Sequence, residues 1–364
     1  EWGHNQIPYF AAKKENFDSS NAREAEIESF LSGLSFAFPK NKVYQSEIKH
    51  LSAKLFSSKI NFKNMEKIYE NSGVKSRFLV NELEWYLDEH NWNERNTLFR
   101  KNTIDLLKKS ISETFDKIPI RIKDIGAIIF INTTGISTPS IDAEIFNLFA
   151  FNNNVKRLPI FGYGCAGGVL GLNRAVEIYK SCGKPVLVCN VELCSLTFRS
   201  QIFSKANIIS TALFGDASSS YVISDEKSNC KIINSFEYTW NNSLELMGWG
   251  VENDGLSVIF DKDIPKFITD NMLNIINEFS IKPKDGYILH SGGMKIIDAY
   301  KKIFGNDKTI EIASNVLSQY GNVSSVSVLL SLREILQNEL VGNFLMSALG
   351  PGFTAGLSEV EIYG

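Results

Sequence analysis

Apolar residues follow two different patterns in two parts of this chain. Within the first hundred residues they recur at helical spacing among many polar residues, as in 22–34 and 82–93, and we expect amphipathic helices there. Beyond Asp124, short apolar runs of strand length alternate with helical patterns. This alternation is typical of an α/β fold in which helices cover a sheet.

Five segments of the second region have clear patterns. Continuous apolar runs predict buried strands over 126–131, 185–191 and 287–289, and helical periodicity predicts helices over 166–180 and 323–336. By contrast, the run Lys156-Arg157-Leu158-Pro159 is a poor central strand, because proline has no N–H to donate to a neighbouring strand.

These strand and helix signals recur at one spacing. The first strand runs into Thr133-Thr134-Gly135, and Tyr163-Gly164-Cys165 opens a helix further along. The last strand runs into His290-Ser291-Gly292-Gly293, and Tyr320-Gly321-Asn322 opens another helix. The offsets, about 158 and about 157 residues, indicate a duplicated α/β unit, with a chance match of the short Tyr-Gly pair as the alternative. We therefore expect two pseudosymmetric halves, 1–228 and 229–364, with Cys165 and Asn322 facing each other across the axis.

Composition narrows the class of protein. The chain has 364 residues, 44% hydrophobic and 22% charged, which is enough for a large core. A net charge of −3 gives no basic field for nucleic acid, and no apolar run approaches the roughly 20 residues that span a bilayer. The start, Glu1-Trp2-Gly3-His4, has neither a signal-peptide pattern nor a methionine, which favours an excised domain or a trimmed terminus. Five cysteines without zinc-ligand spacing predict reduced thiols in a cytoplasmic protein and no metal site.

Three residues at predicted element ends carry candidate chemistry. Cys165 stands among glycines where a helix should begin, so substrate can approach the sulfur and free N–H groups would stabilise a thiolate. His290 precedes glycines at the carboxyl end of a strand, where α/β sites form, although a structural histidine is the alternative. Asn322 alone reads as a helix N-cap. Together, a Cys, a His and an Asn at such positions form a triad pattern for nucleophilic catalysis.

At this point a set of matching segments identifies a resemblance. The chain resembles type III polyketide synthases, the chalcone-synthase-like branch of the thiolase superfamily. In family order, the matching segments over roughly 125–356 are Gly164-Cys165-Ala166-Gly167-Gly168, Val191-Glu192-Leu193-Cys194-Ser195-Leu196-Thr197-Phe198-Arg199, Leu213-Phe214-Gly215-Asp216, Met247-Gly248-Trp249, Asp254-Gly255-Leu256, Lys262-Asp263-Ile264-Pro265, His290-Ser291-Gly292-Gly293, Gly321-Asn322-Val323-Ser324-Ser325 and Gly350-Pro351-Gly352-Phe353.

The resemblance implies a fold, an assembly and a reaction. The expected fold is the five-layered αβαβα thiolase fold, in a homodimer. The expected triad is Cys165, His290 and Asn322. The expected reaction is iterative decarboxylative condensation of an acyl starter, delivered by CoA or by an acyl carrier protein, with malonyl-CoA. Cyclisation would then give an alkylresorcinol, an acylphloroglucinol or an alkylpyrone, with no metal or redox cofactor.

The resemblance also implies roles for residues around the triad. Phe214 matches a gatekeeper between the CoA tunnel and the reaction cavity, which Thr133, Thr134, Cys194, Thr197, Val258 and Ser324 would line. Val258 replaces a second gatekeeper phenylalanine of plant enzymes, which indicates more room, and Ser291 stands where the family usually has proline. Lys63 and Lys67 fall near the family's CoA-phosphate contacts, with solvated lysines as the alternative. The Asn-, Lys- and Ile-rich composition would also suit the C-terminal synthase domain of a Steely-type hybrid with a fatty-acid synthase, with a free-standing microbial alkylresorcinol or alkylpyrone synthase as the alternative.

Three other functions fit parts of the sequence. A β-ketoacyl carrier-protein synthase of the initiation type would share the triad and the fold but condense only once. An NAD-binding dehydrogenase would use Gly162, Gly164 and Gly167 as a dinucleotide fingerprint, with Glu192 about 25 residues beyond them. A non-enzymatic scaffold would form no acyl adduct on Cys165.

Overall fold

One sheet of nine strands runs through the molecule. The computed structural model describes residues 27–56, 62, 65–282 and 284–364. The strand order is β11-β12-β13-β8-β1-β7-β6-β4-β5. At the junction of β8 and β1, two residue pairs join the strands, Ser29 with Ile232 and Phe30 with Lys231. This narrow connection divides the sheet into two half-sheets.

The two half-sheets have the same connectivity. The first contains β1 (Ser29–Ala37), β4 (Ala127–Asn132), β5 (Lys156–Phe161), β6 (Val186–Leu193) and β7 (Asp216–Ser224). The second contains β8 (Cys230–Thr239), β11 (Gly286–Leu289), β12 (Gly342–Gly350) and β13 (Thr354–Ile362). β4 and β6 pair in parallel, as do β11 and β12, and each pair continues into an antiparallel strand, β7 or β13. The pseudosymmetric halves predicted from the sequence are therefore confirmed, and β5 is an additional edge strand.

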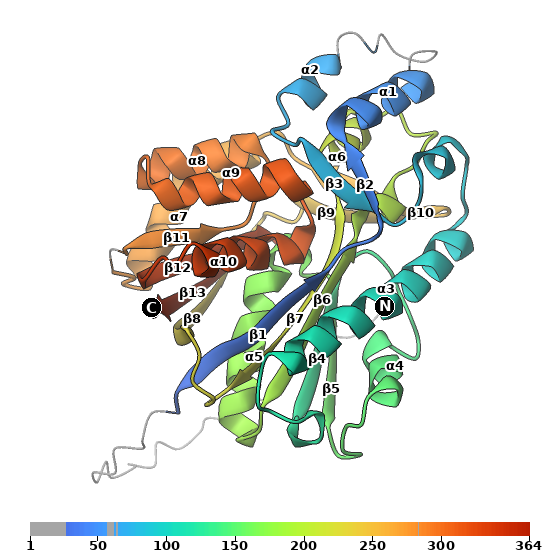
Figure 1. Cartoon of the computed structure of the whole chain (residues 1–364). Helices are drawn as coiled ribbons and strands as arrows, with labels where there is room; N and C mark the ends of the chain where they lie inside the picture. The colour runs from blue at the N-terminus through green and yellow to red at the C-terminus, as the bar shows by residue number, and fades with distance from the viewer. Residues whose placement is uncertain (1–26, 57–61, 63–64, 283) are drawn as a thin grey trace, which may run out of the picture.

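Helices form three layers around and between the half-sheets (Figure 1). The layer outside the first half-sheet contains α3 (Trp92–Asp116) and α4 (Ile141–Leu148). The middle layer contains α5 (Gly167–Cys182) and α10 (Ser327–Gln337). The layer outside the second half-sheet contains α7 (Ile264–Glu278), α8 (Met294–Phe304) and α9 (Lys308–Tyr320). The result is the expected five-layered αβαβα fold, whose central core joins residues such as Ile129, Val169, Leu329 and Met346.

Smaller elements gather at one end of the sheets, at the top of Figure 1. They are helices α1 (Gln45–Phe56), α2 (Glu66–Glu70) and α6 (Lys205–Leu213), the pair β2 (Asn41–Tyr44) with β3 (Ser76–Leu79), and the hairpin β9 (Met247–Glu252) with β10 (Gly255–Phe260). Several of them share a separate apolar cluster that includes Leu51, Phe56 and Ile208. This end of the molecule also carries the candidate site.

The prediction of a helix over 22–34 was wrong in its described part. Residues 29–37 form β1, which pairs with β7 and β8 in the middle of the sheet. Gly33, at φ +67°, falls where the register with β7 shifts between Ser32 and Ser35, and this irregularity interrupts the alternation typical of a strand. Of 82–93, Leu83–Leu87 forms a 3-10 turn and α3 begins at Trp92.

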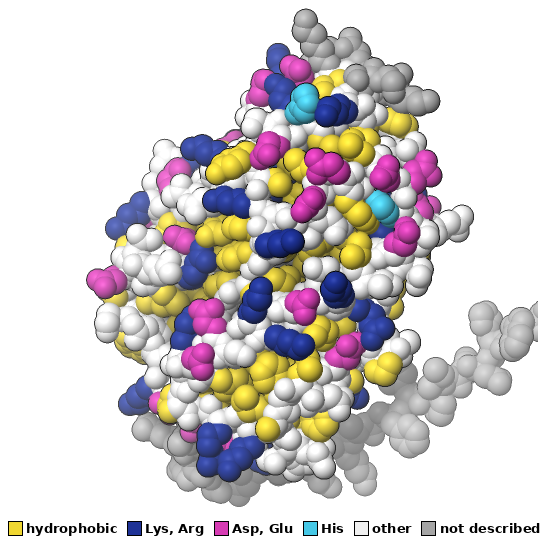
Figure 2. Space-filling model, turned by 45° about the vertical axis from the view of Figure 1, so that its right-hand side comes forward, with side chains coloured by type: hydrophobic (Ala, Val, Ile, Leu, Met, Phe, Trp, Pro, Cys, Tyr) yellow, Lys and Arg dark blue, Asp and Glu magenta, His cyan; other side chains and the backbone are white. Residues whose placement is uncertain are grey.

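Several other features follow the sequence. The strands and helices expected beyond Asp124 are present with small shifts of their ends. Pro159 lies in β5, at the edge of the sheet, where a missing N–H is tolerated. All five cysteines are free thiols. In the described residues no helix has the length and apolar character to cross a membrane. On the face shown in Figure 2, lysines and arginines are interspersed with acidic residues.

Candidate active site

The site lies where the middle-layer helices begin. Cys165 belongs to the 3-10 turn Gly164–Ala166, directly before α5, and Asn322 precedes the turn Ser324–Val326 that leads into α10. These two turns contact each other, Cys165 and Ser324 line the same pocket, and the Ser324 and Asn322 side chains lie near enough to act on the pKa of the Cys165 thiol, which they lower against the effect of burial. The two positions related by the internal repeat therefore meet, as the sequence predicted.

His290 reaches the same place from the end of β11. Gly292 links it to Asn322: the Asn322 amide Nδ2 donates to the Gly292 carbonyl at 3.2 Å, and a Cβ on Gly292 would lie 3.2 Å from His290 Nε2. His290 is 4% exposed, and neither ring nitrogen has a hydrogen-bond partner among the described residues. Buried polar atoms are seldom left unpaired, so this ring is free to meet a ligand.

Glycine is required at the turn that presents Cys165. Gly164 has φ +49°, and a Cβ there would lie 2.6 Å from Cδ of Pro351, so a side chain would strain the backbone and collide with the second half. Its N–H donates to the Thr133 hydroxyl at 2.9 Å. Pro351 thus packs against Gly164, the middle glycine of the dinucleotide fingerprint, where the backbone would have to approach a pyrophosphate.

Asn322 is held by the segment that carries Phe214. The Asn322 N–H donates to the Leu213 carbonyl at 2.7 Å, and the Gly215 N–H donates to the Asn322 carbonyl at 3.0 Å. The side-chain oxygen of Asn322 also accepts from the Ser324 N–H at 2.9 Å, two residues along the chain, which is an Asx turn. The expectation that Asn322 is a helix N-cap was wrong: Val323 is the N-cap of the 3-10 turn and Val326 is that of α10.

Burial controls the charges of the site. It raises the pKa of the Cys165 thiol to about 12, with Glu192 adding to the increase, and it lowers the pKa of His290 to about 4. The helix N–H groups expected to stabilise a thiolate are outweighed by the loss of water around the sulfur. Both groups are neutral at pH 7 in the resting protein, so a thiolate at Cys165 requires a base that takes the thiol proton.

The buried carboxyl group of Glu192 connects two of the backbone segments around Cys165 and Asn322. Glu192 accepts from the Thr133 N–H at 3.1 Å and from the Ser325 hydroxyl at 2.8 Å, and so connects the loop after β4 with the turn before α10. Burial raises its pKa to about 8. Sequence reasoning missed this role; the position of Glu192 at the end of an apolar strand was its only signal.

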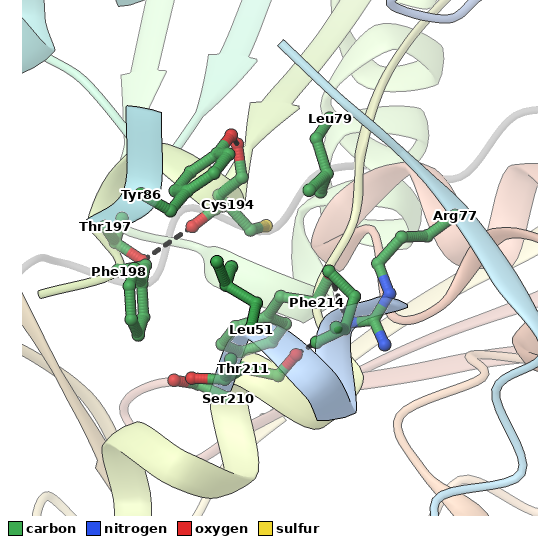
Figure 3. A pocket seen from close by; sticks show the side chains of 12 residues that line it. Leu51, Arg77, Leu79, Tyr86, Cys194, Thr197, Phe198, Ser210, Thr211 and Phe214 are labelled. Carbon is green, nitrogen blue, oxygen red and sulfur yellow. Dashed lines mark hydrogen bonds between the residues drawn. The ribbon is translucent and has the colours of Figure 1, made fainter. Parts of the chain in front are cut away.

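Two adjoining pockets lie at the site. The first touches Cys165 and is lined by four of the predicted cavity residues, Cys194, Phe214, Val258 and Ser324. The β9–β10 hairpin adds its other wall, with Met247, Trp249 and Phe260. The second pocket contains Thr197 and shares Cys194 and Phe214 with the first (Figure 3). These two side chains therefore form the divide between the pockets.

The remaining predicted residues lie elsewhere. Thr133 and Thr134 line neither pocket; their hydroxyls accept from the Gly164 and Leu193 N–H groups, so they brace the surrounding loops. Lys67 is exposed on α2, and Lys63 lies outside the described residues. The structure, over the ranges it describes, holds no cluster of His, Cys, Asp and Glu suited to a metal ion.

Two family profiles match this chain in order. The profile "Chalcone and stilbene synthases, N-terminal domain" matches residues 16–227, and the corresponding C-terminal domain matches 239–358. The chain belongs to the chalcone and stilbene synthase family, and it is a type III polyketide synthase. The synthase is 32% identical to a putative chalcone synthase of Bacillus subtilis, over 90% of this chain and 97% of that protein. It is 26% identical to a phloroglucinol synthase of Pseudomonas fluorescens, over 89% of this chain and 96% of that one.

Solved structures share the fold of the synthase. The 1,3,6,8-tetrahydroxynaphthalene synthase of Streptomyces coelicolor superposes with a TM-score of 0.87 at 23% identity, over 92% of this chain and 99% of that one. The C-terminal type III polyketide synthase domain of Steely1 from Dictyostelium superposes with a TM-score of 0.85 at 23% identity, over the same shares of the two chains. The expectation of a chalcone-synthase-like protein is confirmed.

His290→Ala should slow alkylation of Cys165 by iodoacetamide at pH 7 by about tenfold or more, because no base remains to take the thiol proton. Mass spectrometry of the labelled peptide measures the rate. Labelling of the partly exposed Cys182 in the same sample is the internal control and should not change. Equal Cys165 rates in the two proteins would show that His290 does not activate the sulfur.

Glu192→Gln should reduce the dependence of stability on pH. The ordinary carboxyl pKa is 4.5 and burial raises it to about 8, so the folded protein keeps a proton that the unfolded chain releases. Wild-type stability should therefore fall as pH rises from 4.5 to 8, by on the order of a few kcal/mol. Glutamine cannot ionise and still satisfies Thr133 and Ser325, so denaturant melts of the variant should vary less over this range. The exposed Glu89→Gln should keep the wild-type slope, and the same slope in Glu192→Gln would contradict the assignment.

Proposed function

We propose that this synthase loads an acyl starter onto Cys165, extends it repeatedly with malonyl-CoA and cyclises the product to an alkylresorcinol, an acylphloroglucinol or an alkylpyrone. The observation that carries the proposal is the meeting of a buried thiol, an unpartnered imidazole and an asparagine amide at the start of two helices. The starter arrives as a thioester of CoA or of an acyl carrier protein.

In the loading step, the Cys165 sulfur attacks the thioester carbonyl while His290 takes the thiol proton. The carbon–sulfur bond of the donor breaks, and the departing thiolate receives that proton from His290. The neutral resting pair favours this order, because charge appears only when substrate has displaced water from the pocket.

In the decarboxylation step, malonyl-CoA loses its carboxylate as CO₂, and the electron pair of the broken bond forms an enolate. An N–H of His290 and the free N–H of the Asn322 amide donate to the enolate oxygen. Each such donor is typically worth about 2.7–4 kcal/mol. The enolate carbon then attacks the Cys165 thioester carbonyl, the bond between that carbonyl and the Cys165 sulfur breaks, and the sulfur leaves as a thiolate. The chain, longer by two carbons, remains on the CoA that carried the malonyl unit. The Cys165 thiolate attacks this new thioester and releases CoA, which starts the next cycle. No step exchanges electrons with an external carrier, so the proposal assigns no role to a metal or redox cofactor.

The surroundings of the triad suit a chain that grows in an apolar space. The Phe214 ring lies 5.8 Å from Phe260 and 6.1 Å from Trp249 between ring centroids, as expected of a gate at one wall of the first pocket. The second pocket has an aliphatic and aromatic lining that includes Leu51, Leu79 and Phe198. We assign the second pocket to the tail of an aliphatic starter. Lys67 stays a candidate for the CoA phosphates, and the five free thiols suit a cytoplasmic enzyme.

A homodimer is part of the proposal. Strand β5 ends the sheet with one side unpaired, and Phe161 on it is 52% exposed. Ile136, which follows the neighbouring strand β4, is 46% exposed. An unpaired strand edge with exposed apolar side chains is a surface for a second copy. A monomer by light scattering at micromolar concentration would refute this part.

Product analysis tests the reaction. Incubation with acyl-CoA starters of several chain lengths and malonyl-CoA should give cyclised products with at least two added acetate units, identified by mass and ring type. Cys165→Ala should give none, and the starter should be found on Cys165 in the wild type by mass spectrometry. Products of a single condensation on a carrier protein would instead identify an initiation-type synthase.

Leu51→Trp should restrict the synthase to starters with shorter acyl chains, because the tryptophan side chain would fill the second pocket. The expected kcat/KM falls about tenfold or more for a long-chain acyl-CoA and changes little for a short one, since each excluded methylene is worth roughly 1 kcal/mol or more. Leu55→Trp, on the same helix but outside the pocket lining, is the matched control. Equal losses for long and short starters would contradict the assignment of this pocket.

A further inference from the structure

The side chain of a buried arginine, Arg77, contacts the segment 211–215. This segment contains the Phe214 gate and the backbone groups that hydrogen-bond to Asn322. Arg77, in β3, is 1% exposed. Its Nη1 donates to the carbonyls of Thr211 at 2.8 Å and Phe214 at 3.0 Å, and its Nη2 donates to the carbonyl of Ala212 at 2.9 Å. Nη2 also donates to the side chain of Gln45, and Figure 3 shows the guanidinium beside Phe214 at the end of α6.

The reason for this contact lies in the end of α6. The last carbonyls of a helix have no partner within the helix. Here the contacts of Arg77 with the Ala212 and Phe214 carbonyls are buried. A guanidinium supplies several donors in one plane and a positive charge that suits a helix C-terminus. Burial lowers the pKa of Arg77 only to about 10, so the cation persists at neutral pH.

The segment 213–215 has little freedom on its other side. A Cβ on Gly215 would lie 2.4 Å from the Tyr320 carbonyl and 3.2 Å from the Arg77 Cβ. The segment is therefore pressed between Arg77 and the residues before Asn322. Its backbone pairs with Asn322 through Leu213 and Gly215, while Cys165 is held separately, through the contacts of Gly164 with Thr133 and Pro351.

We propose that Arg77 is a positioning residue of the synthase: by holding residues 211–215 it fixes the Phe214 gate and aims the Asn322 amide at the enolate. The inference rests on the proposed function, because it assigns Asn322 to the enolate oxygen. Arg77 itself touches no reacting atom. A substitution that weakens the Arg77 contacts should therefore change the rate of decarboxylation and the length of the polyketide chain, while Cys165 stays in place.

The test compares Arg77→Lys with Arg95→Lys. Arg95 is also buried, at 5% exposure, and also donates to backbone carbonyls, those of His90, Leu196 and Phe198, but it does not contact 211–215. A lysine ammonium has the charge without the planar fork, so it cannot reach all three carbonyls. In Arg77→Lys we expect malonyl-CoA decarboxylation to lose about tenfold or more in kcat with a smaller change in KM, as for a weakened oxyanion donor.

Two further readouts separate this role from a general loss of structure. Iodoacetamide alkylation of Cys165 should stay within about twofold of wild type in both variants, because the nucleophile is anchored elsewhere. Hydrogen exchange at the Gly215 and Asn322 amides should accelerate in Arg77→Lys and not in Arg95→Lys. If hydrogen exchange at these amides is unchanged in Arg77→Lys, the inference is wrong, even if the synthase makes no polyketide. If exchange accelerates in Arg77→Lys but the wild type does not decarboxylate malonyl-CoA, only the proposed function is wrong.

A milder variant covers the case in which Arg77→Lys does not fold. Gln45→Met removes one partner of the guanidinium and also the hydrogen bond from Gln45 Nε2 to the Ala212 carbonyl at 3.0 Å, while Arg77 keeps its three carbonyls. It should give a smaller loss of decarboxylation together with faster exchange at Gly215. Wild-type values for both in a folded Gln45→Met protein, or parallel losses in Arg77→Lys and Arg95→Lys, would contradict a positioning role.

Discussion

The site depends on the close approach of the first turns of α5 and α10. A Cβ on Gly168 would lie 2.2 Å from the Ser325 carbonyl, and one on Gly167 would lie 3.1 Å from the Ser325 Cβ. Because α5 begins with two glycines, its first turn can lie this close to Ser325. Because Cys165 and Asn322 stand just before those turns, the contact that joins the two halves is also the contact that assembles the site.

A second constraint is the absence of water around the reacting groups. Burial keeps the Cys165 thiol and the His290 ring neutral at rest, and Glu192 largely protonated below pH 8. In such surroundings a newly formed charge interacts strongly with any donor aimed at it. Cys165 and His290 therefore form no ion pair at rest, and in the proposed mechanism the first charges to appear are those of the reaction.

Sequence reasoning found the parts of this arrangement that depend on local pattern. Continuous apolar runs gave β4, β6 and β11, because each is buried on both faces, and the matched offsets gave the pairing of Cys165 with Asn322. It failed for β1, whose Gly33 irregularity interrupts the strand alternation and whose place in the sheet is set by β7 and β8. It also missed the contacts of Arg77 and Glu192, since their partners lie 134 and 59 residues away and no periodicity connects them.

The divide between the two pockets is built from side chains alone. Cys194 comes from a 3-10 turn after β6, and Phe214 follows α6. The backbone around Phe214 anchors Asn322, but its ring takes no part in those hydrogen bonds. A point mutation at either position can thus merge or separate the two spaces while every backbone anchor of the triad persists. During evolution, substitutions at these two positions can change the chain length and ring type of the proposed product, while the residues proposed for the chemistry keep their backbone contacts.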